Sequence, residues 1–175
     1  MSLEFIESKI VTVPDYPKPG IMFRDITPLL ADPNGLKKTT AAMLAEINKK
    51  CLKPTIIAGI ESRGFIFGVA LAEALGLGFV PVRKPGKLPR ATYSVSYELE
   101  YGSDRLEIHQ DAFSTDDNVL VVDYLLATGG TAKATAELIV KTGARICGMM
   151  FVIELDGLGG REAIKGQDII TLLKF

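Results

Sequence analysis

The stretch that most constrains the fold runs from Asn118 to Thr131 and reads N-V-L-V-V-D-Y-L-L-A-T-G-G-T. Val119 to Val122 form an apolar run without alternation, which is typical of a strand covered on both faces in a parallel sheet. The predicted strand stops at Asp123, and a glycine-containing loop then leads into a helical pattern from Ala132 to Lys141. The chain is therefore expected to adopt an α/β fold with a polar residue at the carboxyl end of a central strand.

The loop of this unit, Thr128-Gly129-Gly130-Thr131, suits a phosphate group. Glycine lets the backbone approach an anion, threonine hydroxyls donate hydrogen bonds, and a helix N-terminus presents unpaired N–H groups. The loop matches neither a Walker A sequence nor G-x-G-x-x-G. Asp123 would then lie close to the phosphate, where a ribose hydroxyl or a phosphate-bound Mg²⁺ is held. An ordinary strand-to-helix turn with a threonine cap is the alternative.

A second unit of the same kind lies earlier in the chain. The apolar run Ile56 to Ile60 is followed by Glu61-Ser62-Arg63-Gly64 and by a helical pattern from Phe65 to Leu75. Arg63 can hold a doubly charged phosphate through two parallel hydrogen bonds, and Ser62 offers a hydroxyl. An exposed ion pair between Glu61 and Arg63 is the alternative.

A basic segment follows, reading R-K-P-G-K-L-P-R over residues 83–90 without an acid. Its prolines and glycine favour a mobile loop that closes over an anion, and a solvated charged face is the alternative. Residues 91–102 alternate in polarity and predict a β-ribbon that returns to the body of the protein. Polar residues thus stand at four predicted strand ends, Glu61, Arg83, Asp123 and Glu154, where open α/β sheets bind ligands.

The rest of the chain alternates between the two types of element. Apolar spacing predicts helices over residues 2–13 and 36–50, and strands over residues 77–82, 106–109, 144–154 and 169–173. The prolines of residues 14–20 end the first helix, and residues 21–27 form an extended or looped segment.

Composition excludes several classes of protein. With 175 residues, 47% of them hydrophobic, and a formal net charge of −1, the chain fits one folded domain and is not built to bind nucleic acid. No apolar run is long enough to cross a membrane, and the N-terminus does not look like a signal peptide, so we expect a cytoplasmic protein. The only cysteines, Cys51 and Cys147, and the only histidine, His109, lie far from other ligand types, which argues against a zinc site.

These motifs resemble the adenine phosphoribosyltransferases, a family of type I phosphoribosyltransferases. The likeness covers Ile10 to Leu172. It rests on these segments: the 119–131 motif, A-G-I-E-S-R-G-F-I-F-G from Ala58, R-K-x-G-K-L-P from Arg83, S-Y-E-L-E-Y-G from Ser96, the proline-rich arm before Phe-Arg-Asp, and E-L-x-x-L-x-G-R-E from Glu154. It implies a mostly parallel central sheet flanked by helices in a single domain, residues 1–175. Within that domain it implies an N-terminal hood at about 1–34, a core at about 35–175 and a flexible catalytic loop at about 83–101.

The resemblance also implies an activity: adenine and phosphoribosyl pyrophosphate (PRPP) give AMP and pyrophosphate in purine salvage. Glu100, Arg63 and Lys87 are the implied catalytic residues, with Glu100 managing the proton on the purine. Adenine is placed near Met22, Phe23, Arg24 and Leu155. The implied contacts with PRPP come from Glu61, Ser62, Arg63, Arg83, Lys84, Lys87, Asp123, Tyr124, Ala127, Thr128, Gly129, Gly130 and Thr131.

Three further expectations follow from the family. Mg²⁺ is the implied cofactor, held mainly through PRPP and water with no direct protein ligand. The protein is implied to be a homodimer in which basic residues can reach the partner's site. The loop at Glu61, Ser62 and Arg63 is implied to hold a cis peptide bond that does not precede a proline.

The sequence departs from the family at Tyr124, where the family has a second acid. Losing one charge-assisted hydrogen bond, worth about 1.5–3 kcal/mol, would weaken PRPP binding by about one to two orders of magnitude. This observation supports an alternative function, a PRPP- or nucleotide-binding protein with impaired catalysis. A transferase that uses guanine or hypoxanthine is a third possibility, and the hood motif argues against it.

Overall fold

A five-stranded parallel sheet forms the centre of the computed structural model, which describes residues 2–99 and 102–175. Each neighbouring pair of strands is parallel. The predicted α/β fold with a mostly parallel central sheet is therefore confirmed. Across the sheet the strands follow the order β4 (Gly78–Val82), β3 (Ile56–Ile60), β7 (Asn118–Leu126), β8 (Arg145–Glu154) and β9 (Ile169–Lys174).

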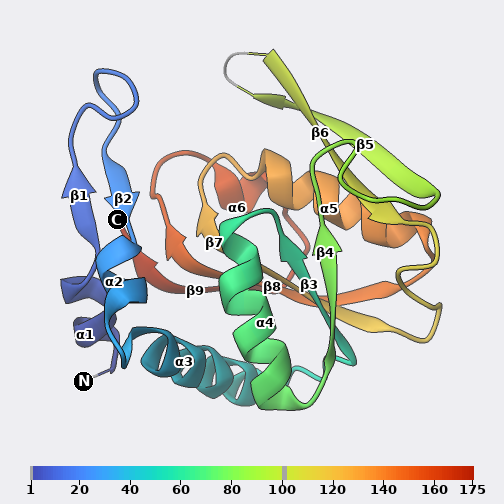
Figure 1. Ribbon diagram of the computed structural model, residues 1–175, viewed down its shortest axis with the longest axis horizontal. Coiled ribbons are helices and arrows are strands. Elements are labelled where there is room, and N and C mark those ends of the chain that lie inside the picture. Colours follow the sequence, from blue (N-terminus) through green and yellow to red (C-terminus); the bar gives the residue numbers. More distant parts are fainter. Residues whose placement is uncertain (1, 100–101) are drawn as a thin grey trace.

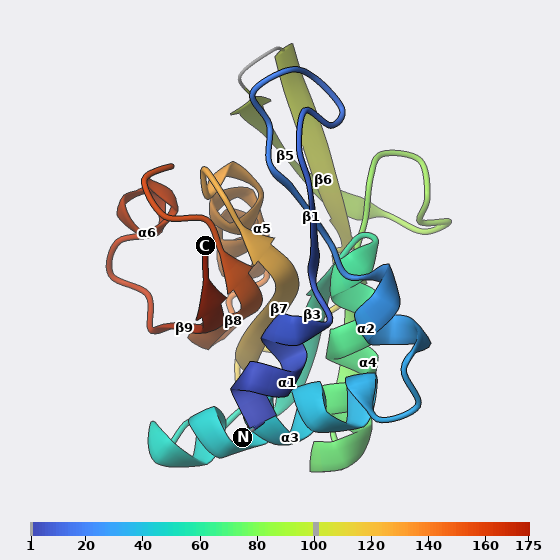
Figure 2. The same cartoon turned by 90° about the vertical axis from the view of Figure 1, so that its left-hand side faces the viewer.

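Helices cover both faces of this sheet. On one face lie α1 (Ser2–Ser8), α3 (Gly35–Lys49) and α4 (Arg63–Leu75), and on the other lies α5 (Gly130–Lys141) (Figures 1 and 2). Successive residues of a strand point to opposite faces. Leu120 and Val122 of β7 accordingly join the apolar layer under α4, whereas Val119 and Val121 join the layer under α5. Burial on both faces explains why the run from Val119 to Val122 is apolar without alternation.

The N-terminal segment forms a small antiparallel hairpin at one end of the molecule (Figure 1). Its strands are β1 (Val11–Val13) and β2 (Phe23–Asp25), which pair from Val11–Asp25 to Val13–Phe23, and α2 (Thr27–Ala31) follows. The helix predicted over residues 2–13 is too long, because α1 ends at Ser8. Residues 11–13 bond instead to β2, and their apolar spacing could not reveal that partner.

The predicted β-ribbon consists of β5 (Thr92–Leu99) and β6 (Gly102–His109), which pair antiparallel and extend from the sheet (Figure 1). Val95 and Leu106 are buried in the layer on the α5 side, and the Lys141 ammonium donates to the Ser94 carbonyl oxygen at 3.1 Å. The ribbon is therefore packed on α5 at its base. Among the described residues, no helix has the length and apolar character needed to cross a bilayer.

Candidate active site

The centre of the candidate site is the second half of β7. The strand does not stop at Asp123, as predicted, but continues to Leu126. β3 pairs with β7 as far as Gly59–Val122, whereas β8 pairs with it as far as Leu126–Glu154. The prediction was wrong because β8, distant in sequence, supplies the hydrogen bonds that extend the strand. β7 thus extends beyond the end of β3, and Asp123 is the first residue of β7 that no longer pairs with β3.

Asp123 is a partly buried carboxylate whose electrostatics suit a binding group. Burial raises its pKa to about 7, although a 2.7 Å hydrogen bond from the Tyr124 N–H and the charge of Arg63 both act to lower it. The N-terminus of α4 packs directly against this point: a Cβ on Gly64 would lie 2.8 Å from the Val122 carbonyl oxygen and 3.1 Å from Asp123 Oδ1. Glycine at position 64 therefore lets Arg63 approach Asp123.

The raised pKa predicts a cost in stability. A carboxyl with an ordinary pKa of 3.8 and a folded-state pKa of about 7 favours folding at low pH, and this contribution is lost as pH rises from about 4 to about 7. Asp123→Asn should therefore increase the free energy of unfolding by about 1–2 kcal/mol at pH 8, and the increase should disappear near pH 4. Urea denaturation at both pH values measures it, with exposed Asp116→Asn as the control. Equal stability of Asp123→Asn and the native chain at pH 8 would contradict the prediction.

The loop that is predicted to bind a phosphate, from Ala127 to Thr131, joins β7 to α5. Gly129 precedes the helix with φ +83°, a left-handed conformation that favours glycine. The first N–H groups of α5 lack partners within the helix and carry the positive end of its dipole. The loop is supported from behind by α6 (Gly160–Ala163): a Cβ on Gly129 would lie 2.7 Å from both the Gly160 carbonyl oxygen and the Ala163 Cβ.

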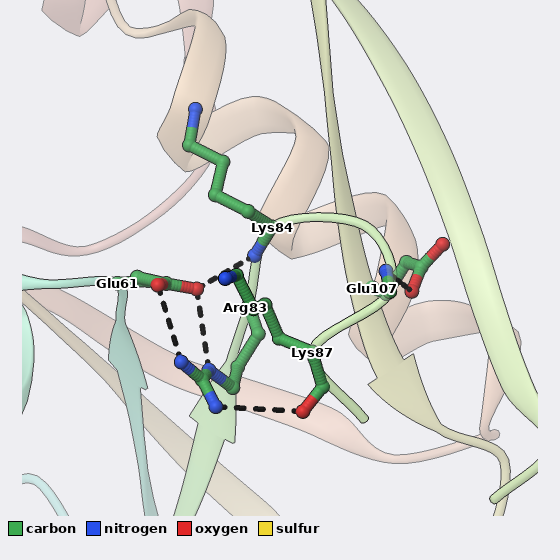
Figure 3. A network of polar contacts seen from close by, with 6 residues as sticks. Glu61, Arg83, Lys84, Lys87 and Glu107 are labelled. Carbon is green, nitrogen blue, oxygen red and sulfur yellow. Dashed lines mark hydrogen bonds and ion pairs between the residues drawn. The ribbon is translucent and has the colours of Figure 1, made fainter. Parts of the chain in front are cut away.

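The second loop, at the end of β3, contains a cis peptide bond between Glu61 and Ser62, as the family resemblance implied. The predicted alternative of an ion pair between Glu61 and Arg63 is wrong. Arg83 binds Glu61 instead, with its Nε and Nη2 atoms each 3.2 Å from a carboxylate oxygen, and the Lys84 N–H donates to the same carboxylate at 2.8 Å (Figure 3). Burial would raise the pKa of Glu61, but these hydrogen bonds outweigh it and lower that pKa.

The basic loop is held by carboxylates in this conformation. The Lys84 ammonium pairs with Asp104 of β6, which also accepts a 3.3 Å hydrogen bond from the Tyr97 hydroxyl. The Gly86 N–H donates to Glu107 at 3.1 Å. Lys87 joins the network through its backbone, since its carbonyl oxygen accepts from Arg83 Nη1 at 3.4 Å (Figure 3).

One cavity brings most of the predicted PRPP contacts together. Those that line it are Glu61, Ser62, Arg63, Lys84, Asp123, Tyr124, Ala127, Thr128, Gly129, Gly130 and Thr131. The other predicted residues do not line it: Arg83, Lys87, Met22, Phe23, Arg24 and Leu155. The predicted proton-transferring residue, Glu100, lies outside the described residues.

The cavity also contains residues that the sequence did not single out. Leu125, Leu126, Ala132 and Phe151 are apolar, and nothing local distinguishes them from ordinary core residues. Leu106 and Tyr97 reach the cavity from the β-ribbon. Of these residues, only Tyr97 could have been proposed from the sequence, because it follows the predicted mobile loop within a strand of alternating polarity.

The hood approaches this cavity at Phe23, whose ring centre lies 6.0 Å from the Arg63 guanidinium. Phe23 packs edge-on against Tyr16, with ring centroids 5.1 Å apart, and Met22 is 49% exposed. Arg24 and its sequence neighbour Asp25 do not pair with each other but have separate partners. The Arg24 guanidinium lies 4.4 Å from the centre of the Phe175 ring, and Asp25 accepts from the N–H and hydroxyl of Thr27 at 2.8 Å.

A partly buried ion pair anchors the segment behind the loop from Ala127 to Thr131. Arg161 of α6 donates from Nε and Nη2 to the two oxygens of Glu154 at 2.6 and 2.7 Å, and the Thr171 hydroxyl donates to the same carboxylate at 2.8 Å. The hydrogen bond from Arg161 is the main cause of the lowered pKa of Glu154. The carboxylate at the end of β8 thereby fixes α6 against the loop.

Several known proteins are similar to this chain over almost its whole length. A family model described as phosphoribosyl transferase domain matches residues 27–172. The adenine phosphoribosyltransferase of Francisella tularensis subsp. novicida (strain U112) is 73% identical over 175 residues, which is 100% of both chains. The crystal structure of adenine phosphoribosyltransferase from Thermoanaerobacter pseudethanolicus aligns with a TM-score of 0.94 at 50% identity over 99% of both chains. That of the Saccharomyces cerevisiae enzyme, complexed with an imino-altritol bisphosphate and adenine, aligns with a TM-score of 0.95 at 40% identity over 98% of both chains.

Proposed function

Because the chain belongs to the phosphoribosyltransferase family, we propose that it converts adenine and PRPP into AMP and pyrophosphate in purine salvage. The observation that carries this proposal is the cavity in which two loops, each leading into a helix N-terminus, meet at Asp123. Such a cavity can hold two phosphate groups of one molecule with a ribose between them. The full-length similarity to adenine phosphoribosyltransferases supports adenine as the acceptor.

The reaction breaks the C1–O bond to pyrophosphate while positive charge develops on the ribose ring. We assign the departing anion to Arg63, Lys84 and Lys87, since charge stabilisation by fixed cations lowers such a barrier. The loop from Thr128 to Thr131 would bind the 5′-phosphate, and Asp123 the ribose hydroxyls. Glu100 would handle the proton on the purine ring.

The ion pairs of the basic loop bear on this mechanism. Arg83 and Lys84 are paired with Glu61 and Asp104, so binding of an anion at these cations requires the pairs to exchange partners. The residues 83–101 would move as a loop that excludes water, which protects PRPP from hydrolysis.

The site fits Mg²⁺ that is held by its substrate. Asp123 offers one carboxylate at the cavity, and the described residues contain no group of three or more His, Cys, Asp or Glu side chains placed to hold a metal. Mg²⁺ keeps several water molecules and often binds through one or two carboxylates together with substrate phosphates. When bound, it would neutralise charge on the pyrophosphate group.

We also propose the assembly and the location that the family resemblance implies. The chain would act in the cytoplasm as a homodimer of single-domain subunits, with exposed apolar residues of α4, Ile66 and Val69, available to a partner. The alternative of a binding protein with impaired catalysis has no observation in its favour beyond Tyr124.

A steady-state assay tests the proposed function. The native chain with Mg²⁺, adenine and PRPP should form AMP and pyrophosphate, and should form product from guanine or hypoxanthine at least about a hundredfold more slowly, since a site built to hydrogen-bond one base rejects others. Size-exclusion chromatography with light scattering tests the dimer. Absence of AMP formation from a folded native chain would refute the enzyme, and faster turnover of hypoxanthine would refute the acceptor.

A further inference from the structure

Tyr124 lies on the face of β7 that is turned toward α4. Its side chain belongs to the apolar layer that contains Leu120 and Val122, and the residue is only 6% exposed. Asp123 precedes it in a strand whose side chains alternate, so the two residues point to opposite faces. An acid at position 124 would therefore lie in the layer under α4 that contains Leu120 and Val122.

The residue that Tyr124 meets there is Arg63. The Arg63 guanidinium lies 4.2 Å from the centre of the Tyr124 ring, within the range of a cation–π interaction. The Arg63 guanidinium also lies 6.0 Å from the centre of the Phe23 ring in the hood, which is the outer limit for a cation–π interaction. Tyr124 is thus the aromatic ring that holds Arg63 most closely.

Unlike Arg83 and Lys84, Arg63 is not paired with a carboxylate in the described part of the chain. Arg83 is paired with Glu61, and Lys84 with Asp104. Within the ranges 2–99 and 102–175, Arg63 forms no ion pair within 4 Å. It lies over the rings of Tyr124 and Phe23, and it also interacts with the Tyr124 hydroxyl and with the charge of Asp123. An aromatic ring attracts a guanidinium without cancelling its charge, whereas a carboxylate would cancel it.

From these contacts we infer that Tyr124 is a positioning residue, which holds the Arg63 guanidinium by its ring so that the positive charge faces the pyrophosphate group. This inference rests on the proposed function, because it takes Arg63 as a pyrophosphate contact. It reverses the expectation drawn from sequence, in which tyrosine only removes an acceptor from the ribose site. Tyr124 acts through Arg63 and not through the ribose.

A double-mutant cycle tests the inference with inorganic pyrophosphate as the probe. Isothermal titration calorimetry at fixed Mg²⁺ should show that Tyr124→Leu weakens pyrophosphate binding about 2- to 30-fold, the range of a cation–π interaction. In the Arg63→Met background, Tyr124→Leu should have no further effect. Tyr124→Phe keeps the ring and should bind within about threefold of the native chain. Tyr124→Asp should bind more weakly than Tyr124→Phe, because it neutralises Arg63.

Two readouts separate positioning from general packing. Tyr124→Leu should raise the KM for PRPP and leave the KM for adenine unchanged. In spectra of protein labelled with ¹⁵N-arginine, the Arg63 side-chain signal should carry a ring-current shift in the native chain and in Tyr124→Phe that is lost in Tyr124→Leu. If the leucine variant does not fold, Tyr124→Met replaces it in every measurement.

The outcomes are distinct from those of the activity assay. Equal loss of pyrophosphate binding on Tyr124→Leu in both backgrounds, no loss in either, or no pyrophosphate binding by the native chain would overturn the inference. An intact cycle in a chain that forms no AMP would support Tyr124 as the positioning residue and refute the enzyme. AMP formation without coupling between Tyr124 and Arg63 would support the enzyme and refute Tyr124 as the positioning residue.

Discussion

Replacing Gly129 by alanine should lower kcat/KM for AMP formation by at least about a hundredfold. The added Cβ would lie 2.7 Å from the Gly160 carbonyl oxygen and from the Ala163 Cβ, closer than real contacts allow. Its neighbours are backbone and a short side chain of α6, which cannot rotate away, so the loop from Ala127 to Thr131 must shift. Displacement of a positioning group by about 1 Å can cost about 100-fold in rate.

Backbone strain alone does not account for this expected loss. Alanine at φ +83° also costs about 1–2 kcal/mol in stability, since left-handed backbone is unfavourable for residues with a Cβ. Gly76 is the matched control, because it has φ +67° at the end of α4 and a Cβ there would have nothing within 4 Å. Gly76→Ala should lose similar stability and keep native kinetics. Equal kcat/KM for the two variants would show that contact between the loop and α6 does not position the phosphate.

Replacing Arg161 by methionine should lower the free energy of unfolding by about 2–4 kcal/mol at pH 7.5, because it leaves a buried carboxylate without its main partner. The Glu154 side chain is 6% exposed, whereas the Arg161 side chain is 41% exposed. In the reverse substitution, Glu154→Gln, the remaining guanidinium can reach water and the amide can still accept from Thr171. That variant should lose only about 1–2 kcal/mol.

The pH dependence distinguishes the two substitutions. In the native chain the pKa of Glu154 is lowered, chiefly by Arg161, so the pair stabilises the fold above the ordinary pKa of 4.5 and this contribution is lost as pH falls through the folded value. In Arg161→Met the carboxyl can be protonated instead, so the deficit should shrink between pH 7.5 and pH 5.

Urea denaturation at these two pH values provides the measurement. Lys165→Met removes a cation from an exposed position just after α6 and should change stability by less than about 0.5 kcal/mol. A larger loss for Glu154→Gln than for Arg161→Met at pH 7.5 would contradict the argument from burial. Because α6 supports the loop that we propose binds the 5′-phosphate, Arg161→Met should also raise the KM for PRPP.

The sequence predicted those parts of the site that consecutive residues build. A buried strand, a glycine-containing turn and a helix form one continuous segment at residues 56–75 and again at residues 118–141, and both were located within a few residues. The positions of Asp123 and of the loop from Thr128 to Thr131 followed from the same local patterns. The resemblance to one family added the cis peptide bond at Glu61, which no spacing of residues encodes.

Contacts between distant segments were not predictable. The ion pair of Arg83 with Glu61 spans 22 residues of sequence, and the ring contact of Arg24 joins the hood to the last residue, Phe175. The extension of β7 to Leu126 depends on hydrogen bonds to β8. Each needs a partner brought close by the fold, and charge or polarity alone does not select among the available partners.

At position 124 the sequence and the structure provide different information. The sequence alone shows that a tyrosine follows Asp123 where the family has an acid, and that a hydrogen-bond acceptor is absent there. What the tyrosine contacts depends on the fold, because the layer that covers each face of a strand sets the surroundings of the side chains on that face. The packing of α4 against β7 places the Arg63 guanidinium 4.2 Å from the centre of the Tyr124 ring. The tyrosine therefore forms a contact of its own at the position where the family has a carboxylate.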